Sequence, residues 1–551
     1  MAIASPKSKA AFYIFASLPL VYFLLFGFHG MDAADRGFIP ALAYRILGGE
    51  VIYRDFFYVR PPLTPYLHTL EMALLPDTWE MIGYRLVYYV FMWLPIYWSI
   101  RALERYVDFG KMGVSPWILG AMGYALSLHN FFAAPWHTVD GIFFAALGFY
   151  AMTRSSRPLH VGLGLFCLGL SALTKQPFGV VPFIGVGLAV FLHGWRQGLL
   201  GTVVTAGLAG IGFAVVEFAL TPGYSFFSEM LAQITGSTSL NEMRWGGYQL
   251  YIRPAVIAFG PGLVIWLVLK FAFKKSFNGW PMAIYTLLGL VAVGAGMLAV
   301  TIQYGGFVQP KTGFIHALVF CGGAIAGLTF IRRDRKAMAL LLAMTGVAWA
   351  SGISWGYAIP VLYCFPAVFA VAYFISHIAE FRAPSWYWTG AMVVVLGCMG
   401  ALNLYVYHDG KRSEITHDLG EVFPKLSHIK AGPEQFANYS ELKMLIGKYP
   451  QPYTVLPSLP LAHYLTDTKA PLPVDWAHDA EVNYDRGIGK LISTLEASNS
   501  MVFVMREELY RAEEDGHYRC STLRHVLDHW DRVDSTSAFY VYRKGMTANP
   551  Q

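Results

Sequence analysis

Long apolar runs recur along the first three quarters of the chain and constrain its fold more than any other feature. An apolar run of about 18 residues can cross the hydrocarbon core of a bilayer as a helix. About thirteen such runs, several of them shorter, can be distinguished: 11–28, 84–100, 114–128, 141–152, 161–173, 178–192, 199–220, 255–273, 282–300, 314–331, 338–350, 358–375 and 386–404. They predict a polytopic α-helical membrane protein with about thirteen transmembrane helices, and we expect interfacial helices in the first outer loop. If the fourth and fifth runs form a re-entrant pair, eleven spans remain and the parity stays odd.

Composition excludes a conventional soluble enzyme. Apolar residues make up 55% of the 551-residue chain and charged residues 14%, whereas a soluble protein carries about a quarter charged residues. The net charge of +6 does not indicate a nucleic-acid partner, because the basic residues lie at the ends of apolar runs, as membrane topology requires.

The polar residues are concentrated in the last quarter of the chain. Of the 76 charged residues, 36 lie in 404–551. We therefore predict two domains: a transmembrane domain over 1–404 and an extracytoplasmic α/β domain over 405–551. In the second domain the pattern predicts a helix at 441–448 and strands at 453–456, 501–505 and 539–543. A structural or acceptor-positioning role is the simplest interpretation of this domain.

Lys and Arg alternate between the connections that join the runs. One set of connections holds Arg101, Arg105 and Lys111, then Arg154 and Arg157, Arg196, Lys270, Lys274 and Lys275, Arg332 to Lys336, and Arg382; the other set holds chiefly Lys175, Arg244 and Lys311. The positive-inside rule then places the N-terminus in the cytoplasm and an uncleaved first span in the cytoplasmic membrane. The loop 30–80 and the C-terminal domain face the periplasm or the cell exterior.

Two carboxylates, Asp32 and Asp35, follow the first span directly. Acidic residues are costly next to lipid, which makes both candidates for catalysis. The alternative is that they cap an interfacial helix that starts near Gly37, since negative charge suits a helix N-terminus.

The same loop continues with Tyr53, Arg54, Tyr58 and Arg60, and Arg60 precedes a Pro-Pro pair that fixes the backbone. This cluster suits a phosphate, because Arg donates two parallel hydrogen bonds to phosphate oxygens. A neighbouring Asp can take a proton from an incoming hydroxyl. The alternative for Arg54 and Arg60 is snorkelling at the membrane interface.

These motifs resemble the polytopic glycosyltransferase C superfamily, which uses polyprenyl-phosphate sugars, as in the protein O-mannosyltransferase and aminoarabinose transferase groups. The resemblance is carried by the acidic motif at 35–37, by Leu-Gly-Gly at 47–49 with 51–57, by a basic residue before Pro61, by Trp-His-Thr-Val-Asp at 136–140 and by 173–177. Related sequences have Asp-Glu-Gly where this chain has Asp35-Arg36-Gly37, so Asp32 is the candidate to replace the missing acid. The resemblance implies an inverting transfer on the outer face with Asp35 as the base.

Three further residues are candidates for binding substrate in the outer loops: Asp140, His137 and Lys175. Asp140 lies at the mouth of an apolar run and needs a partner, for which Lys175, His137, a metal ion or the acceptor are the options. Lys175 lies on the outer side against the charge trend, which the binding of an anionic lipid head would explain. A divalent cation at Asp35 or Asp140 is left open.

We therefore predict a membrane glycosyltransferase that transfers a sugar from a polyprenyl-phosphate carrier to a hydroxyl on a lipid, glycan or protein acceptor. Its partners are the lipid donor, the acceptor and membrane lipids. A polytopic transporter or lipid-linked sugar flippase is the main alternative, although the apolar runs show no internal repeat. A non-catalytic assembly protein is a second alternative.

Overall fold

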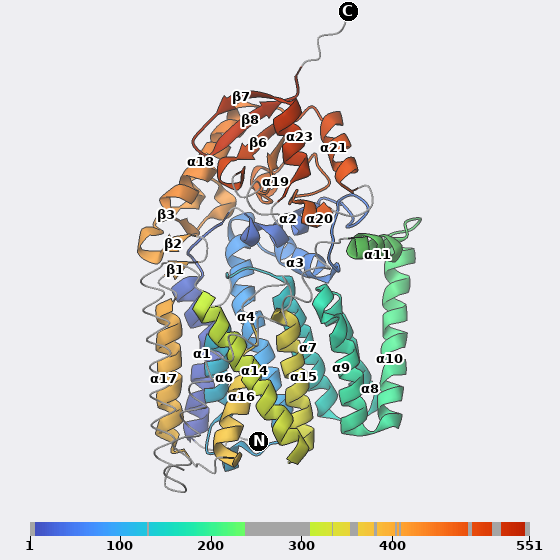
Figure 1. Ribbon diagram of the computed structural model, residues 1–551, viewed down its shortest axis with the longest axis vertical. Coiled ribbons are helices and arrows are strands. Elements are labelled where there is room, and N and C mark those ends of the chain that lie inside the picture. Colours follow the sequence, from blue (N-terminus) through green and yellow to red (C-terminus); the bar gives the residue numbers. More distant parts are fainter. Residues whose placement is uncertain are drawn as a thin grey trace, which may run out of the picture.

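The structure is a bundle of long helices, with two shorter helices across one end and a small sheet above them (Figure 1). The computed structural model describes residues 6–32, 34–128, 132–236, 309–332, 334–352, 362–378, 383–402, 405–406, 409–482, 487–509 and 519–545. The bundle contains α1 (Pro6–Phe26), α4 (Asp77–Leu103), α6 (Pro116–Leu128), α7 (His137–Arg154), α8 (Pro158–Ala172), α9 (Val181–His193), α10 (Trp195–Ala214), α14 (Gln309–Arg332), α15 (Arg335–Gly352), α16 (Phe365–Tyr373) and α17 (Ser385–Leu402).

The predicted apolar runs match these helices. Runs 255–273 and 282–300 lie outside the described residues, and the other eleven runs fall on helices of the bundle. Among the described residues, five helical stretches are long and apolar enough to cross a membrane. The predicted polytopic helical architecture is confirmed, and the number of spans stays a prediction.

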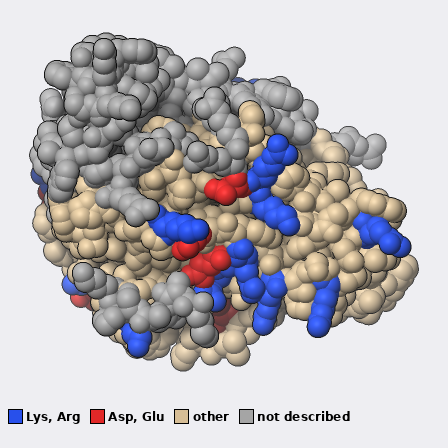
Figure 2. Space-filling model, turned by 90° about the horizontal axis from the view of Figure 1, so that it is seen from below, with Lys and Arg blue, Asp and Glu red and all other residues tan. Residues whose placement is uncertain are grey.

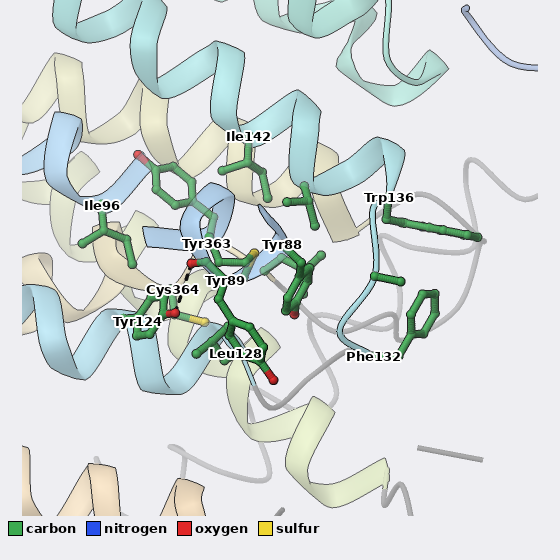
Figure 3. Close-up of a cluster of buried hydrophobic side chains, with 14 of the residues drawn as sticks. Tyr88, Tyr89, Ile96, Tyr124, Leu128, Phe132, Trp136, Ile142, Tyr363 and Cys364 are labelled. Carbon is green, nitrogen blue, oxygen red and sulfur yellow. Dashed lines mark hydrogen bonds between the residues drawn. The ribbon is translucent and has the colours of Figure 1, made fainter. Parts of the chain in front are cut away.

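The bundle has a buried aromatic core between α4, α6 and α7 (Figure 3). Two of its tyrosine hydroxyls are paired, whereas the Tyr88 hydroxyl has no hydrogen-bond partner among the described residues. Tyr124 of α6 donates to the backbone carbonyl of Tyr89 on α4 at 3.1 Å, and Tyr363, just before α16, bonds with Ser99 of α4. At the bundle edge α10 instead exposes apolar side chains such as Val203 and Ile211, which suits contact with lipid.

The two ends of the bundle bear on the predicted topology. The start of α1 and the sheet lie at opposite ends, which agrees with the predicted topology. Figure 2 shows Lys and Arg side chains spread across the end away from the sheet, with acidic side chains beside some of them. The orientation in the membrane and the placement of the C-terminal region outside the cytoplasm stay predictions.

Two short helices of the first outer loop lie between the bundle and the sheet. They are α2 (Asp35–Leu47) and α3 (Leu63–Leu74), as the prediction of interfacial helices requires. Gly37 lies within α2, and a Cβ atom at this position would lie 2.4 Å from Cγ of Leu461. The glycine therefore allows the C-terminal region to approach α2 closely.

The C-terminal region contains a four-stranded sheet in the order β5-β6-β8-β7. Strands β5 (Tyr453–Leu456), β6 (Met501–Met505) and β8 (Phe539–Arg543) have the predicted boundaries, and the predicted helix lies within α18 (Pro433–Lys448). The pair β5–β6 is parallel, whereas β8 pairs antiparallel with β6 and with β7 (Asp531–Ser535). The sequence reading missed β7, because this exposed edge strand is mostly charged and polar, as unpaired edges commonly are. The domain boundary at 404/405 stays a prediction.

The first outer loop and the C-terminal region are packed into one another. Gly30 N donates to Lys430 O, and Lys430 N donates to Phe28 O, both at 2.8 Å. Phe57 belongs to the smaller apolar core under the sheet, and its amide donates to Pro473 O at 2.8 Å. The two regions therefore share a core instead of meeting at a loose interface.

A buried arginine joins the same two regions. Arg45 at the end of α2 donates to Asp475 Oδ2 at 2.8 Å and to Leu472 O at 2.6 Å, and it also pairs with Glu50 at 2.8 Å. Only 5% of the Arg45 side chain and 4% of the Asp475 side chain are exposed. At this depth the loss of one partner costs far more than at the surface.

We expect Asp475→Asn to lower the free energy of unfolding by about 2 kcal/mol, because a buried guanidinium loses one of its two carboxylates. Thermal unfolding of the purified protein in detergent measures the change. Asp55→Asn is the matched control, since Asp55 pairs with Arg54 at the surface, where ion pairs contribute roughly 0–1 kcal/mol. Equal losses of stability in the two variants would contradict a structural role for the Arg45–Asp475 pair.

Candidate active site

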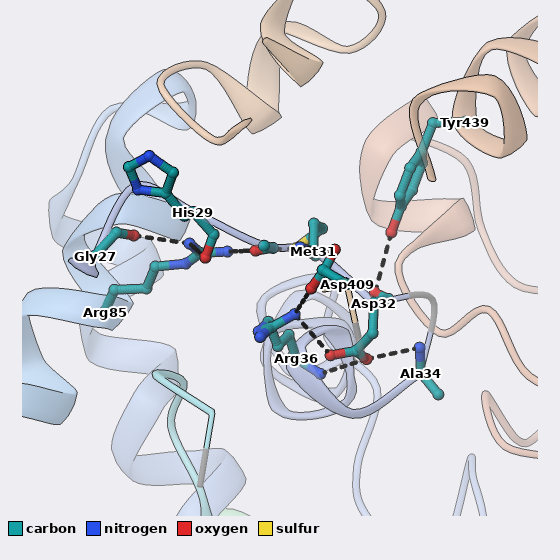
Figure 4. Close-up of polar contacts among 10 residues, drawn as sticks. Gly27, His29, Met31, Asp32, Ala34, Arg36, Arg85, Asp409 and Tyr439 are labelled. Atoms are coloured by element: carbon teal, nitrogen blue, oxygen red, sulfur yellow. Dashed lines mark hydrogen bonds and ion pairs between the residues drawn. The ribbon is translucent and has the colours of Figure 1, made fainter. Parts of the chain in front are cut away.

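The turn between α1 and α2 is held by two buried arginines (Figure 4). Arg85 of α4 donates to the backbone carbonyls of Gly27 at 2.7 Å and Gly30 at 2.5 Å. Arg36 pairs with Asp32 at 3.2 Å and with Asp409 of the C-terminal region at 2.6 Å. The entry to α2 is therefore fixed from both the bundle and the C-terminal region.

Asp32 lies in this structural network. Its Oδ1 accepts hydrogen bonds from the backbone amides of Ala34 at 3.0 Å and Arg36 at 3.2 Å. It thereby satisfies an amide of the first turn of α2, although the N-cap residue itself is Ala34. The helix begins at Asp35, two residues before the expected start near Gly37. The geometry favours the capping alternative for Asp32, and its catalytic role stays a prediction.

Asp35 is half-buried in the first turn of α2, close to two cations. Arg60 and Lys175 both lie within electrostatic range of its carboxylate, which acts to raise the pKa of each. The structure thus places Asp35, Arg60 and Lys175 within electrostatic range of one another. In the sequence, 25 positions separate Asp35 from Arg60, and 115 separate Arg60 from Lys175. This cluster is the candidate site.

Arg60 is buried and held on several sides. Its guanidinium forms a two-pronged ion pair with Glu481 of the short helix α20 (Asp479–Val482) and lies 5.3 Å from the ring centroid of Phe38. Its backbone carbonyl accepts from the Tyr53 hydroxyl at 2.6 Å. Burial alone would lower the pKa of Arg60, but the Glu481 carboxylate raises it, so the side chain stays a cation.

Lys175 is a buried lysine at the start of the single helical turn η1 (Gln176–Val180). Its ammonium lies 5.9 Å from the ring centroid of Trp136. Burial and the nearby Arg60 hold the pKa of Lys175 well below its usual value, and the acids Glu481 and Asp35 act against this shift. An arriving anion would stabilise its charged form.

Tyr53 and Tyr58 support the site from within the loop. Tyr53 adopts a left-handed backbone conformation with φ of 70°. Gln233 of α11 (Phe226–Gly236) accepts from Tyr58 N at 3.0 Å and donates to Tyr53 O at 2.9 Å. The Tyr58 hydroxyl bonds with Nε2 of His137, the first residue of α7.

Asp140 has a partner that the sequence analysis did not consider. His68 of α3 contacts Asp140 Oδ1 through Nε2 at 3.2 Å and Glu71 through Nδ1 at 2.9 Å. Burial by itself would lower the pKa of His68, but Asp140 and Glu71 raise it to about 10. His68 is therefore a cation between two carboxylates at neutral pH.

Some predicted residues lie apart from the cluster or outside the described chain. Arg54 is exposed and pairs with Asp55 at 2.8 Å. Among the described residues, no three His, Cys, Asp or Glu side chains are arranged to hold a metal ion. Arg244 lies outside the described residues.

Sequence reasoning missed Glu481, Asp409 and His68. The first two pair with loop arginines from more than 370 positions away, which no local pattern reveals. His68 carried a weak local signal, because Glu71 follows it by three residues on a helix.

Comparisons with known proteins identify the fold. No protein-family model and no curated protein sequence matches the chain. The apo oligosaccharyltransferase of Archaeoglobus fulgidus is 12% identical with a TM-score of 0.50, over 99% of this chain and 75% of that chain. ArnT from Cupriavidus metallidurans bound to undecaprenyl phosphate is 12% identical with a TM-score of 0.47, over 99% of this chain and 100% of that chain.

A third structure, A. fulgidus AglB in complex with an inhibitory peptide and a dolichol-phosphate, is 14% identical with a TM-score of 0.47, over 100% of this chain and 75% of that chain. The oligosaccharyltransferase match shows a shared fold. The fold expected from the superfamily resemblance is therefore confirmed, and the roles of individual residues stay predictions.

We expect stability to depend on His68 in a pH-dependent way. Its pKa is about 10 in the folded chain against 6.5 ordinarily, so its contribution is complete below pH 6.5 and is lost as the pH rises through 10. The difference in unfolding temperature between wild type and His68→Gln should be largest at pH 6 and smallest at pH 10. His525→Gln, which removes a part-exposed histidine paired with Glu496, is the control. A difference for His68→Gln that is independent of pH would contradict the ion-pair assignment.

Proposed function

We propose that the protein is a membrane glycosyltransferase that takes its sugar from a polyprenyl-phosphate carrier. The observation that carries this proposal is the convergence of Asp35, Arg60 and Lys175 between the bundle and the C-terminal region. A carboxylate near a buried guanidinium and a buried lysine provides both a base and a site for a phosphate. An oligosaccharyltransferase shares this fold, which supports the same class of reaction.

In the proposed reaction Asp35 takes the proton of an acceptor hydroxyl. The acceptor oxygen forms a bond to the anomeric carbon as the bond from that carbon to the phosphate oxygen breaks. The electron pair leaves with the polyprenyl phosphate, and the anomeric configuration inverts. Asp35 suits this role better than Asp32, because both Asp32 oxygens are directed to Arg36 and the backbone of α2.

Arg60 and Lys175 stabilise the leaving phosphate. Negative charge grows on this group in the transition state, and fixed cations in a dry site stabilise it strongly. Arg60 is held in place by Phe38, Tyr53 and the following prolines. The two Nη atoms that bind Glu481 keep further N–H donors, so the phosphate can share the guanidinium with Glu481 or displace it.

The proposed function also gives a role to the remaining parts of the chain. The acceptor is a lipid, glycan or protein hydroxyl, reached from outside the cytoplasmic membrane. The C-terminal region over 405–551 completes the site through Glu481 and positions the acceptor. Asp140 acts near the acceptor or the sugar, and the comparison with and without chelator tests for a divalent cation.

We expect Asp35→Asn to reduce transfer roughly 10²- to 10⁴-fold, the usual contribution of a general base. Transfer of label from radiolabelled polyprenyl-phosphate sugars to native membranes measures the rate, with and without chelator. Asp55→Asn, in the same loop but exposed, should transfer at nearly the wild-type rate. A folded Asp35→Asn protein with full activity would remove Asp35 from the role of base.

A second experiment tests the phosphate site by binding alone. Arg60→Gln would leave Glu481 as a buried unpaired charge, so the double variant Arg60→Gln/Glu481→Gln is used to keep the site neutral. It should bind undecaprenyl phosphate roughly 10- to 100-fold more weakly, because charged hydrogen bonds are lost. Arg54→Gln, at the exposed position, should bind normally. Equal binding of undecaprenyl phosphate by the double variant and by wild type would place the phosphate site elsewhere. If the protein moves a lipid-linked sugar across vesicle membranes without transferring it, the flippase alternative would be favoured.

A further inference from the structure

Three deeply buried polar atoms lie at the meeting of α3 and α7, beside the candidate site. Within the described part of the chain, Thr64 Oγ1, His137 Nδ1 and Asp140 Oδ2 have no hydrogen-bond partner. Thr64, His137 and Asp140 are 0% exposed. A buried polar atom without a partner costs about 1–3 kcal/mol, so each of these atoms calls for a partner that the described residues do not supply.

The geometry of the two helices brings these atoms to a common interface. Thr64 lies one turn before His68 on the same face of α3, and His137 lies three residues before Asp140 on the same face of α7. The contact of 3.2 Å between His68 and Asp140 joins the two faces. The unpaired atoms therefore belong to residues within about one helical turn of the contact between His68 and Asp140.

The charges at this point decide the class of ligand. His68 pairs with both Asp140 and Glu71, so acidic groups outnumber basic groups in this triad. This balance disfavours an anionic ligand. The unpaired atoms offer a carboxylate oxygen, a hydroxyl and a ring nitrogen, which together suit neutral hydroxyl groups.

Aromatic rings lie next to the same atoms. The ring of His137 is 5.2 Å from the ring of Trp136 and 6.0 Å from the ring of Tyr58. An apolar ring face beside hydroxyl-binding groups suits the alternating apolar and polar surfaces of a sugar. Tyr58 also connects this point to the neighbourhood of Arg60.

We propose that Thr64, His137 and Asp140 form a subsite for the hydroxyl groups of the donor sugar, with His68 as the residue that positions Asp140. This inference rests on the proposed function and adds to it the place where the sugar is recognised. Asp140 Oδ2 accepts from one sugar hydroxyl, because Oδ1 is already bound by His68. Thr64 Oγ1 and His137 Nδ1 bind others.

The test compares lipids with and without the sugar. Binding of undecaprenyl-phosphate mannose, glucose and 4-aminoarabinose is measured beside binding of undecaprenyl phosphate alone, for wild type and Thr64→Val. The variant should bind its best sugar-bearing lipid about fivefold more weakly, the contribution of one hydrogen bond. It should bind undecaprenyl phosphate as wild type does, and its unfolding temperature should be unchanged or higher, because an unpaired buried hydroxyl is removed.

Thr69→Val is the matched control, since Thr69 is on the same helix and its hydroxyl already donates to Pro65 O at 2.8 Å. It should leave the preference for sugar-bearing lipid intact. Asp140→Asn should lose more of that preference than Thr64→Val, and His68→Gln should lose part of it.

If Thr64→Val binds both kinds of lipid like wild type, or loses affinity for both equally, the proposed sugar subsite is wrong while the phosphate site stands. If wild type binds neither kind of lipid, the proposed function fails and this inference fails with it.

Discussion

The structure depends on three buried arginines of the first outer loop, each of which finds its acid in the C-terminal region. Removing the carboxylate partner of a buried guanidinium leaves an uncompensated buried charge, so the loop and the C-terminal region require one another. The pairs are Arg36–Asp409, Arg45–Asp475 and Arg60–Glu481. The arginines are spread along the loop, and together they hold both α2 and the segment before α3 against the C-terminal region.

This pairing explains where the candidate site lies. The Arg36 pair fixes the start of α2 and with it the carboxylate of Asp35, and the Glu481 pair fixes the guanidinium of Arg60. Lys175 approaches from the bundle. The site therefore draws on the loop, the bundle and the C-terminal region, and preorganised charges of this kind stabilise a developing anion without further reorganisation.

Local patterns predicted most of the fold and only part of the site. Apolar runs predicted eleven described helices, and alternation predicted β5, β6 and β8 with their boundaries. The charged edge strand β7 has no such pattern. Asp35, Arg60 and Lys175 were found because Asp, Arg and Lys are unusual beside apolar runs, whereas Glu481 looks like any acid in a polar segment. Arg54 and Arg60 looked equivalent in sequence, and only the fold separates an exposed pair from a buried one.

The central claim is that Arg60 and Lys175 bind the phosphate of a lipid carrier beside Asp35. A structure of the full chain with bound undecaprenyl phosphate tests it most directly. We expect the phosphate oxygens within hydrogen-bond distance of the Arg60 guanidinium and the Lys175 ammonium, with the lipid tail leaving along the bundle. A phosphate bound at the basic end away from the sheet, with Arg60 still paired only to Glu481, would contradict the account.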